Sequence, residues 1–83
     1  MTPTFEEFQT SKQSMTTEEF TTLLPNYKDS ITAPDVLVYM GNLYIEDWGI
    51  NVNPKYHLTL DREEFLSDDL THLEKALYQW EYL

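Results

Sequence analysis

Two runs of β-forming residues flank the dipeptide Gly41-Asn42, and this arrangement constrains the fold more than any other part of the sequence. The runs cover residues 36–40 and 43–46. A two-residue Gly-Asn connection is typical of a β-hairpin, because both residues accept the positive φ that its turn requires. If Met40 pairs with Leu43, the alternation of side chains along a strand defines two faces. The predicted core face holds Val36, Val38, Met40, Leu43 and Ile45, and the outer face holds Leu37, Tyr39, Tyr44 and Glu46.

A third strand is predicted after the hairpin. Trp48 continues the outer face, and Gly49 offers a β-bulge that would bring the following residues back to the core side. Residues 56–60 then alternate between the two faces of a strand. The inward side chains would be Tyr56, Leu58 and Leu60. The three strands together predict an antiparallel meander.

Helices are predicted before these strands. Residues 4–7 and 16–19 each show the capping-box pattern, in which a threonine and a glutamate three residues later cap one helix start. The first helix would fade near Ser14. The second must end before Pro25, because the residue before a proline is pushed out of the helical region. Residues 26–34 are predicted to form a loop.

The C-terminal segment is predicted to be an amphipathic helix that begins at a cap on Ser67 or Asp68. Residues 61–66 favour one helical turn before it. The side that should cover the sheet carries Leu70, Leu73, Leu77 and Trp80, with Ala76 beside them. The opposite, solvent-facing side carries Thr71, Glu74, Lys75, Tyr78, Glu81 and Tyr82.

These elements predict a single α+β domain over residues 1–83, in the order ααβββα, with the meander packed against helices. A chain of 83 residues can build one modest core, and without cysteine it has no disulfide to support it. The longest apolar run, residues 36–40, is too short to span a bilayer. The first residues lack the pattern of a signal peptide, so we expect a cytoplasmic protein.

Charge is the most unusual property of the sequence. Fifteen Asp and Glu against five Lys and Arg give a net charge of −10, of which residues 61–83 carry −5. Nucleic acid and anionic membranes would repel such a chain, so we expect direct binding to neither. The charge serves solubility alone, or it complements a basic surface on a partner. Both interpretations stay open.

Groups that could perform catalysis are few. The chain has two histidines, His57 and His72, and two glycines, but no nucleophile motif and no Gly-rich phosphate loop. Asp68 and Asp69 precede His72 at helical spacing, but the cap of a helix start explains them without a metal. Five adjacent carboxylate pairs, with nothing to single one out, are typical of a solvated surface. An enzyme is therefore the least favoured hypothesis, and we predict no catalytic residue, no metal site and no cofactor.

Aromatic residues make up 14% of the chain, more than one small core requires. Tyr39, Tyr44 and Trp48 share the predicted outer face of the hairpin, and Tyr and Trp are favoured at protein interfaces. Alternatively, an N-terminal helix covers this face and makes it a second core layer, because the phenylalanines of that region need a surface to cover.

The sequence thus predicts a non-enzymatic, acidic protein-binding module. Its most specific form is a small inhibitor or nucleic-acid mimic that docks on the basic groove of a DNA- or RNA-binding protein, by analogy with small phage-encoded anti-defence proteins. The alternative is a small regulatory or assembly subunit of a larger cytoplasmic complex, whose acidity serves only solubility. The predicted partner-binding residues are Asp61, Glu63, Glu64, Asp68 and Asp69, together with Tyr39, Tyr44, Glu46, Asp47 and Trp48.

Overall fold

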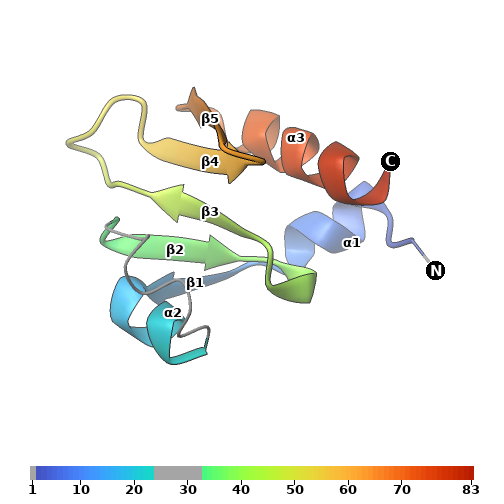
Figure 1. Ribbon diagram of the computed structural model, residues 1–83, viewed down its shortest axis with the longest axis horizontal. Coiled ribbons are helices and arrows are strands. Elements are labelled where there is room, and N and C mark those ends of the chain that lie inside the picture. Colours follow the sequence, from blue (N-terminus) through green and yellow to red (C-terminus); the bar gives the residue numbers. More distant parts are fainter. Residues whose placement is uncertain (1, 24–32) are drawn as a thin grey trace.

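The computed structural model describes residues 2–23 and 33–83 of the chain. Within these residues three α-helices and five strands form one compact unit (Figure 1). The helices are α1 (Phe5–Thr10), α2 (Thr17–Leu23) and α3 (Leu70–Tyr82), and the strands are β1 (Gln13–Thr16), β2 (Asp35–Val38), β3 (Tyr44–Asp47), β4 (Tyr56–Leu60) and β5 (Glu63–Ser67). Most of the loop predicted over 26–34, and the predicted end of the second helix before Pro25, lie outside the described residues.

The five strands form one antiparallel sheet, in which strands follow one another in space as they do in the chain, β1-β2-β3-β4-β5. The α+β class and the antiparallel sheet are confirmed. The three-stranded meander and the order ααβββα are wrong, because β1 and β5 add a strand at each edge. Both edge strands are exposed along most of their length. The alternation of apolar and polar residues that marks a half-buried strand is therefore missing from them.

The β2–β3 hairpin forms where the sequence predicts it, but in a different register. Val38 pairs with Tyr44, and the expected pair of Met40 with Leu43 is not formed. The connection instead contains a 3₁₀ turn over Met40–Asn42, whose central glycine has a φ of 73°. The glycine is thus used for positive φ, as predicted, but in a longer loop than two residues.

This shift of one residue moves each β3 side chain to the face opposite the predicted one, relative to β2, because neighbouring side chains of a strand point to opposite sides. One face of the hairpin carries Val36, Val38, Tyr44 and Glu46, and the other carries Leu37 and Ile45. Val36, Val38 and Ile45 are all buried, as predicted, but they are buried on two different sides of the sheet.

A second hairpin joins β4 to β5. Leu60 pairs with Glu63 across the two-residue turn Asp61-Arg62, whose φ values are 47° and 72°. Positive φ at both residues is the turn geometry that best matches the twist of paired strands. The helical turn predicted over 61–66 is wrong. Aspartate adopts positive φ more readily than most residues, but an arginine in the sequence does not indicate such a turn.

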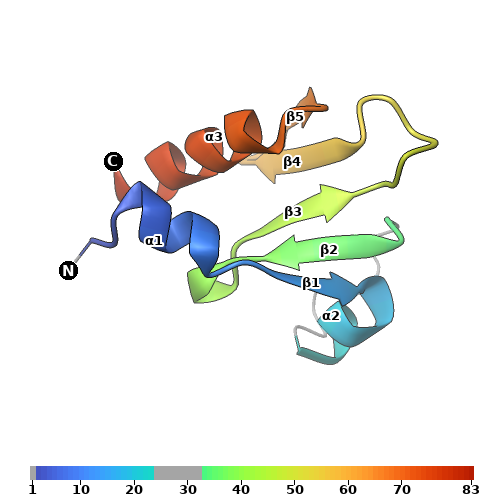
Figure 2. The ribbon, with the colours of Figure 1, turned by 180° about the vertical axis from the view of Figure 1, so that it is seen from behind.

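Helices cover both faces of the sheet: α1 and α3 lie on one side and α2 on the other (Figures 1 and 2). The larger core, beneath α1 and α3, contains Phe8, Tyr39, Ile45, Leu58, Leu73 and Leu77. The smaller core, beneath α2, contains Phe20, Val36 and Val38. Helix α2 packs against β1 and β2. Strands β4 and β5 lie at the other end of the sheet, away from α2.

Helix α3 packs on two sides rather than one. Leu73 and Leu77 are buried against the sheet as predicted, but Trp80 is 57% exposed. Tyr78 and Tyr82, which were expected to face solvent, instead contact the phenylalanines of α1. The predicted solvent-facing side is therefore wrong in part, because α1 lies along it.

Both predicted capping boxes are present. At the first, Thr4 and Glu7 exchange hydrogen bonds between side chain and backbone N–H. At the second, Thr16 and Glu19 do the same at 3.0 and 3.1 Å, and these bonds lower the pKa of the Glu19 carboxyl from its ordinary value. The backbone N–H of Thr16, the last residue of β1, therefore already donates to the Glu19 carboxylate.

Candidate protein-binding surface

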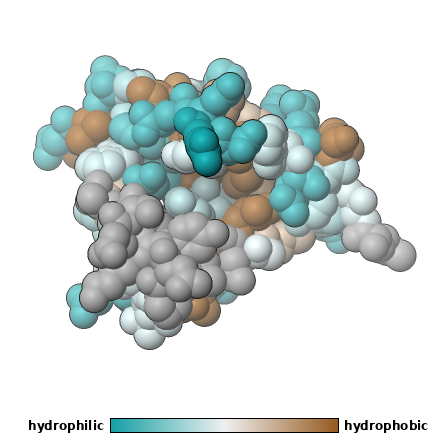
Figure 3. Space-filling model, viewed as in Figure 1, coloured by the Kyte–Doolittle hydropathy of each residue, from teal (hydrophilic) through white to brown (hydrophobic). Residues whose placement is uncertain are grey.

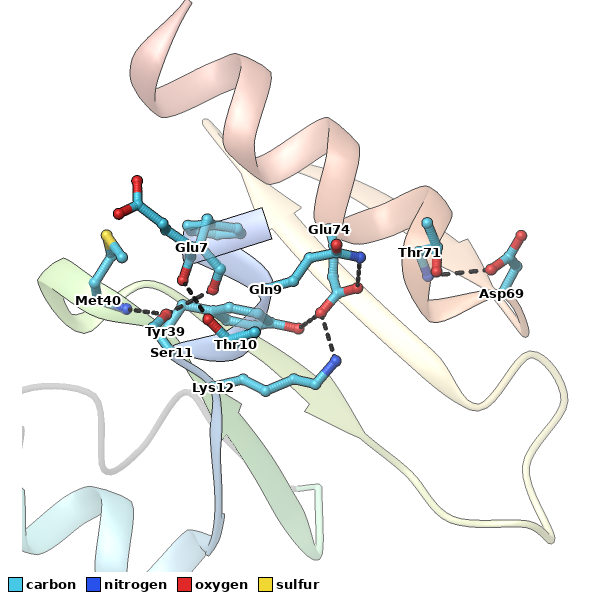
Figure 4. A network of polar contacts seen from close by, with 11 residues as sticks. Glu7, Gln9, Thr10, Ser11, Lys12, Tyr39, Met40, Asp69, Thr71 and Glu74 are labelled. Atoms are coloured by element: carbon cyan, nitrogen blue, oxygen red, sulfur yellow. Dashed lines mark hydrogen bonds and ion pairs between the residues drawn. The ribbon is translucent and has the colours of Figure 1, made fainter. Parts of the chain in front are cut away.

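Among the residues that the structure describes, the most buried charge is the Glu74 carboxylate on α3, which is 1% exposed. It accepts three hydrogen bonds, shown in Figure 4: Gln9 Nε2 donates to Oε1 at 3.1 Å, and Lys12 Nζ and the Tyr39 hydroxyl donate to Oε2 at 2.9 and 2.7 Å. The donors come from α1, from the segment after it and from the residue that follows β2. The carboxylate thus joins three parts of the chain, and bonds to a charged acceptor are stronger than neutral ones.

Tyr39 is part of this interior arrangement and is 3% exposed. Its ring stacks on Phe8 with the centroids 4.7 Å apart. Burial, and then the hydrogen bond to Glu74, raise the pKa of the Tyr39 phenol above its ordinary value, so the phenol stays protonated and donates. Although Tyr39 was predicted to bind a partner, its side chain lies in the interior.

The sequence reasoning missed Glu74, which it assigned to solvent. One signal was available: Glu74, Tyr78 and Tyr82 follow one another at intervals of four residues and so lie on one stripe of the helix. Two tyrosines on one stripe indicate that this side of the helix packs against another element of the fold. The polar residue on the same stripe then becomes a candidate for a buried group.

Two of the five acids in the predicted C-terminal cluster have structural partners. Asp68 Oδ1 accepts from the Lys55 N–H at 2.9 Å, which ties the loop before β4 to the loop after β5. Asp69 Oδ1 accepts from the Thr71 N–H at 3.1 Å and so caps α3. Neither carboxylate is therefore fully available to a partner.

The other three acids belong to the β4–β5 hairpin and are exposed. Asp61 lies in the turn, while Glu63 and Glu64 are neighbours on β5 and therefore point to opposite faces of the sheet. The next two residues, Phe65 and Leu66, are 38% and 45% exposed. We call Asp61, Glu63, Glu64, Phe65 and Leu66 the hairpin surface.

The face of β3, β4 and β5 opposite α3 carries a second group of predicted residues. Glu46 pairs with His57, and His57 in turn pairs with Leu66, so these three side chains cross the sheet on one face. The Trp48 ring lies 5.3 Å from the His57 ring. The structure thus brings two predicted residues, Glu46 and Trp48, next to the hairpin surface.

The environment of Glu46 is unfavourable for its charge. Burial raises the pKa of the Glu46 carboxyl and Glu64 adds to this, whereas His57 and the Trp48 indole oppose it. The Trp48 Nε1–H is close enough to act on the carboxylate, yet this buried donor has no partner with hydrogen-bond geometry among the described residues. The group is therefore less well satisfied than Glu74.

The remaining predicted residues serve the fold. Tyr44 packs against Phe20 of α2, with ring centroids 5.1 Å apart. Asp47 Oδ1 accepts from the Gly49 N–H at 3.0 Å and lies 4.0 Å from Lys55 Nζ. The prediction that Tyr39 and Tyr44 share one face is wrong: Tyr39 packs on Phe8 of α1 in the larger core, and Tyr44 packs on Phe20 of α2 in the smaller one, so two helices on opposite sides of the sheet cover them.

Positive charges neutralise few of the acids. Within residues 2–23 and 33–83 the ion pairs are Lys12 with Glu74 at 2.9 Å and Lys55 with Asp47 at 4.0 Å. Arg62 is exposed beside Glu63 but pairs with none of the described acids. Figure 3, in the view of Figure 1, shows hydrophilic residues over much of the surface, with separate hydrophobic residues among them.

Sites for small ligands are poorly developed. In the described part of the chain, no group of three His, Asp or Glu side chains could hold a metal ion, and no helix is long and apolar enough to cross a membrane. One hollow has a volume of about 300 Å³ and lies against Phe5, Tyr78 and Leu83. It contains no acid and no histidine. No protein-family model, no curated protein and no solved structure matches this chain.

Proposed function

We propose that this chain is a non-enzymatic, acidic protein-binding module that docks on a basic surface of a partner protein. The observation that supports it is the uncompensated charge: the net charge is −10, and two ion pairs form among the described residues. Exposed acids with no cation beside them keep their full field outside the molecule, and such a field accelerates encounter with a basic surface.

The basic groove of a nucleic-acid-binding protein is the target that we favour, with the chain acting as an inhibitor or nucleic-acid mimic in the cytoplasm. Such grooves are lined with Lys and Arg that contact phosphates. Asp61 lies at the tip of the β4–β5 hairpin, and Glu63 and Glu64 lie on its two faces at the edge of the sheet. Carboxylates placed there would occupy the positions that phosphates normally take.

A second candidate is a regulatory or assembly subunit whose acidity serves only solubility. Phe65 and Leu66 favour it, because two adjacent apolar side chains on an edge strand remain 38% and 45% exposed. The two candidates differ in the force that drives binding. Charge-driven binding weakens as salt shortens the Debye length from about 10 Å at 0.1 M to about 3 Å at 1 M, whereas apolar binding does not.

The experiment compares two variants that lose the same charge from different places. The first neutralises the hairpin surface with Asp61→Asn, Glu63→Gln and Glu64→Gln. The matched control carries Glu6→Gln, Glu18→Gln and Glu81→Gln, which are exposed and take part in no ion pair. Partners are captured from a cell lysate at low salt, and their association rates are then measured with purified proteins.

We expect the hairpin variant to associate with the partner far more slowly than the control, binding to weaken steeply with salt, and nucleic acid to compete. If both variants associate at the same rate, the hairpin is not the contact. If binding is unchanged by salt and by both variants, the proposal is wrong and the subunit candidate replaces it.

A further inference from the structure

Strand β5 pairs with β4 on one side and forms an edge of the sheet on the other. Along an antiparallel strand, residues alternate between pairs that exchange both hydrogen bonds and pairs that exchange none. Leu60 and Glu63 close a two-residue turn, and residues in this position exchange both bonds. The alternation then turns the N–H and C=O groups of Glu63, Phe65 and Ser67 toward β4, and those of Glu64 and Leu66 toward the open edge.

The open edge is not used by the rest of the described chain. No side chain or backbone group of residues 2–23 or 33–83 hydrogen-bonds to the backbone of Glu64 or Leu66 from outside the β4–β5 ladder. The opposite edge differs, because on β1 the Thr16 N–H already donates to Glu19 at 3.0 Å. Unpaired N–H and C=O groups on an exposed edge are a template for another strand.

The side chains of β5 define what such a strand would carry. In an added antiparallel strand, the residues opposite Glu63 and Glu64 would face carboxylates, and those opposite Phe65 and Leu66 would face half-exposed apolar side chains. Opposite charges and apolar pairs directly across a ladder stabilise it, and like charges destabilise it. A second copy of β5, paired so that Leu66 lies opposite Glu64, would place carboxylates opposite apolar side chains and would bring together two chains that each carry a net charge of −10, so it fits this edge poorly.

We propose that β5 binds an extended, basic segment of a partner protein by adding it to the sheet as a sixth strand. Read from its N-terminus, the segment carries two apolar residues followed by two cationic ones, which lie opposite Leu66, Phe65, Glu64 and Glu63 in turn. This mode of recognition takes affinity from backbone hydrogen bonds and specificity from the side chains. The inference rests on the proposed function, because it names the element and the kind of segment through which the acidic module docks.

The test uses the intact protein, labelled with ¹⁵N, and blocked six-residue peptides of the sequence Thr-Val-Val-Lys-Lys-Thr. One peptide carries N-methyl groups on its second and fourth residues, whose N–H groups would bond to Leu66 and Glu64. The matched peptide carries them on its third and fifth residues, whose N–H groups would point away from β5. A Thr-Val-Val-Glu-Glu-Thr peptide controls for charge. Binding is followed from amide shifts, and amide hydrogen exchange is measured at Glu64 and Leu66.

We expect the unmodified peptide to bind and to slow amide exchange at Glu64 and Leu66. Methylation at the second and fourth residues should weaken binding about tenfold or more, because it removes two hydrogen bonds, while the matched peptide keeps its affinity. If both methylated peptides bind as well as the unmodified one, strand addition is wrong although charge-driven docking stands. If the glutamate peptide binds as tightly as the lysine peptide, the basic-partner proposal itself fails. Dimerisation of the free protein through β5 would also overturn the inference.

Discussion

The interior around Glu74 and the exposed strand β5 use the same residue type in opposite ways. Glu74 is 1% exposed and accepts hydrogen bonds from Gln9, Lys12 and Tyr39. Glu63 and Glu64 are exposed, and no described cation forms an ion pair with either. The first carboxylate has its partners inside the molecule, whereas the other two have none there. The two exposed carboxylates are open to solvent, whereas Glu74 links α3 to α1 and to the segments that follow α1 and β2.

The largest difference between the two regions should appear in stability. Replacing Glu74 with alanine leaves the buried Tyr39 hydroxyl without an acceptor, while Lys12, whose side chain is 37% exposed, can turn toward water. We therefore expect Glu74→Ala to lower the free energy of unfolding by about 2–4 kcal/mol in urea denaturation. As a control on the same helix, Glu81→Ala should change it by less than about 0.5 kcal/mol. Equal losses in the two variants would mean that Glu74 is not a special acceptor.

The turn of the β4–β5 hairpin offers a smaller effect of the opposite sign. Arg62 has a φ of 72°, a conformation that costs a residue with a Cβ about 1–2 kcal/mol and costs glycine little. The greater entropy of glycine in the unfolded chain offsets part of this relief. We therefore expect Arg62→Gly to raise the free energy of unfolding by about 0.5–1 kcal/mol. Arg62→Lys keeps the strained backbone and should leave stability unchanged. A loss of stability in Arg62→Gly would contradict the two-residue turn.

The smallest effect concerns Glu46, which lies on the face of the sheet opposite α3. Because the pKa of its carboxyl is raised in the folded protein, protonation stabilises the fold, and this contribution is present below the ordinary value of 4.5 and lost as the pH rises through the higher folded value. Glutamine imitates the protonated form. Glu46→Gln should therefore raise the free energy of unfolding at pH 7, by about 0.5 kcal/mol once solvent screening is allowed for.

The gain in Glu46→Gln should disappear as the pH falls below about 4.5, where Glu46 itself is protonated in both states. Thermal unfolding at several pH values measures it, with Glu6→Gln on α1 as the exposed control. A gain that grows as the pH falls would show that the folded carboxyl prefers its charged form, which would contradict the unfavourable surroundings of Glu46.

Local signals in the sequence were sufficient for the elements whose cause is local. The capping boxes of α1 and α2 and the buried leucines of α3 follow from spacing alone. The β2–β3 hairpin was also found, but its register was not. Gly41 supplies positive φ equally well to a two-residue turn and to a longer one, and only packing on both faces of the sheet selects between them.

The features that sequence reasoning missed depend on contacts between distant parts of the chain. Strand β5 exists because β4 offers it a ladder, since its own residues are mostly exposed and carry no period-two pattern. Glu74 is buried because α1 lies beside α3. Its hydrogen-bond donor Gln9, on α1, is 65 residues away from it in the sequence. Of the five acids predicted to bind a partner, Asp61, Glu63 and Glu64 are exposed and form no ion pair with a described residue, whereas Asp68 and Asp69 serve as backbone acceptors.

Amide hydrogen exchange along β5 in the free protein is the most direct test of whether this strand has an open edge. A strand with one paired side and one open side should alternate in protection. We predict slow exchange at Phe65 and Ser67, whose N–H groups face β4, and fast exchange at Glu64 and Leu66, whose N–H groups face the open edge. Equal protection at all four amides would show that the edge is already covered. Fast exchange at Phe65 and Ser67 would show that the strand is not formed, and either result would contradict the proposed docking edge.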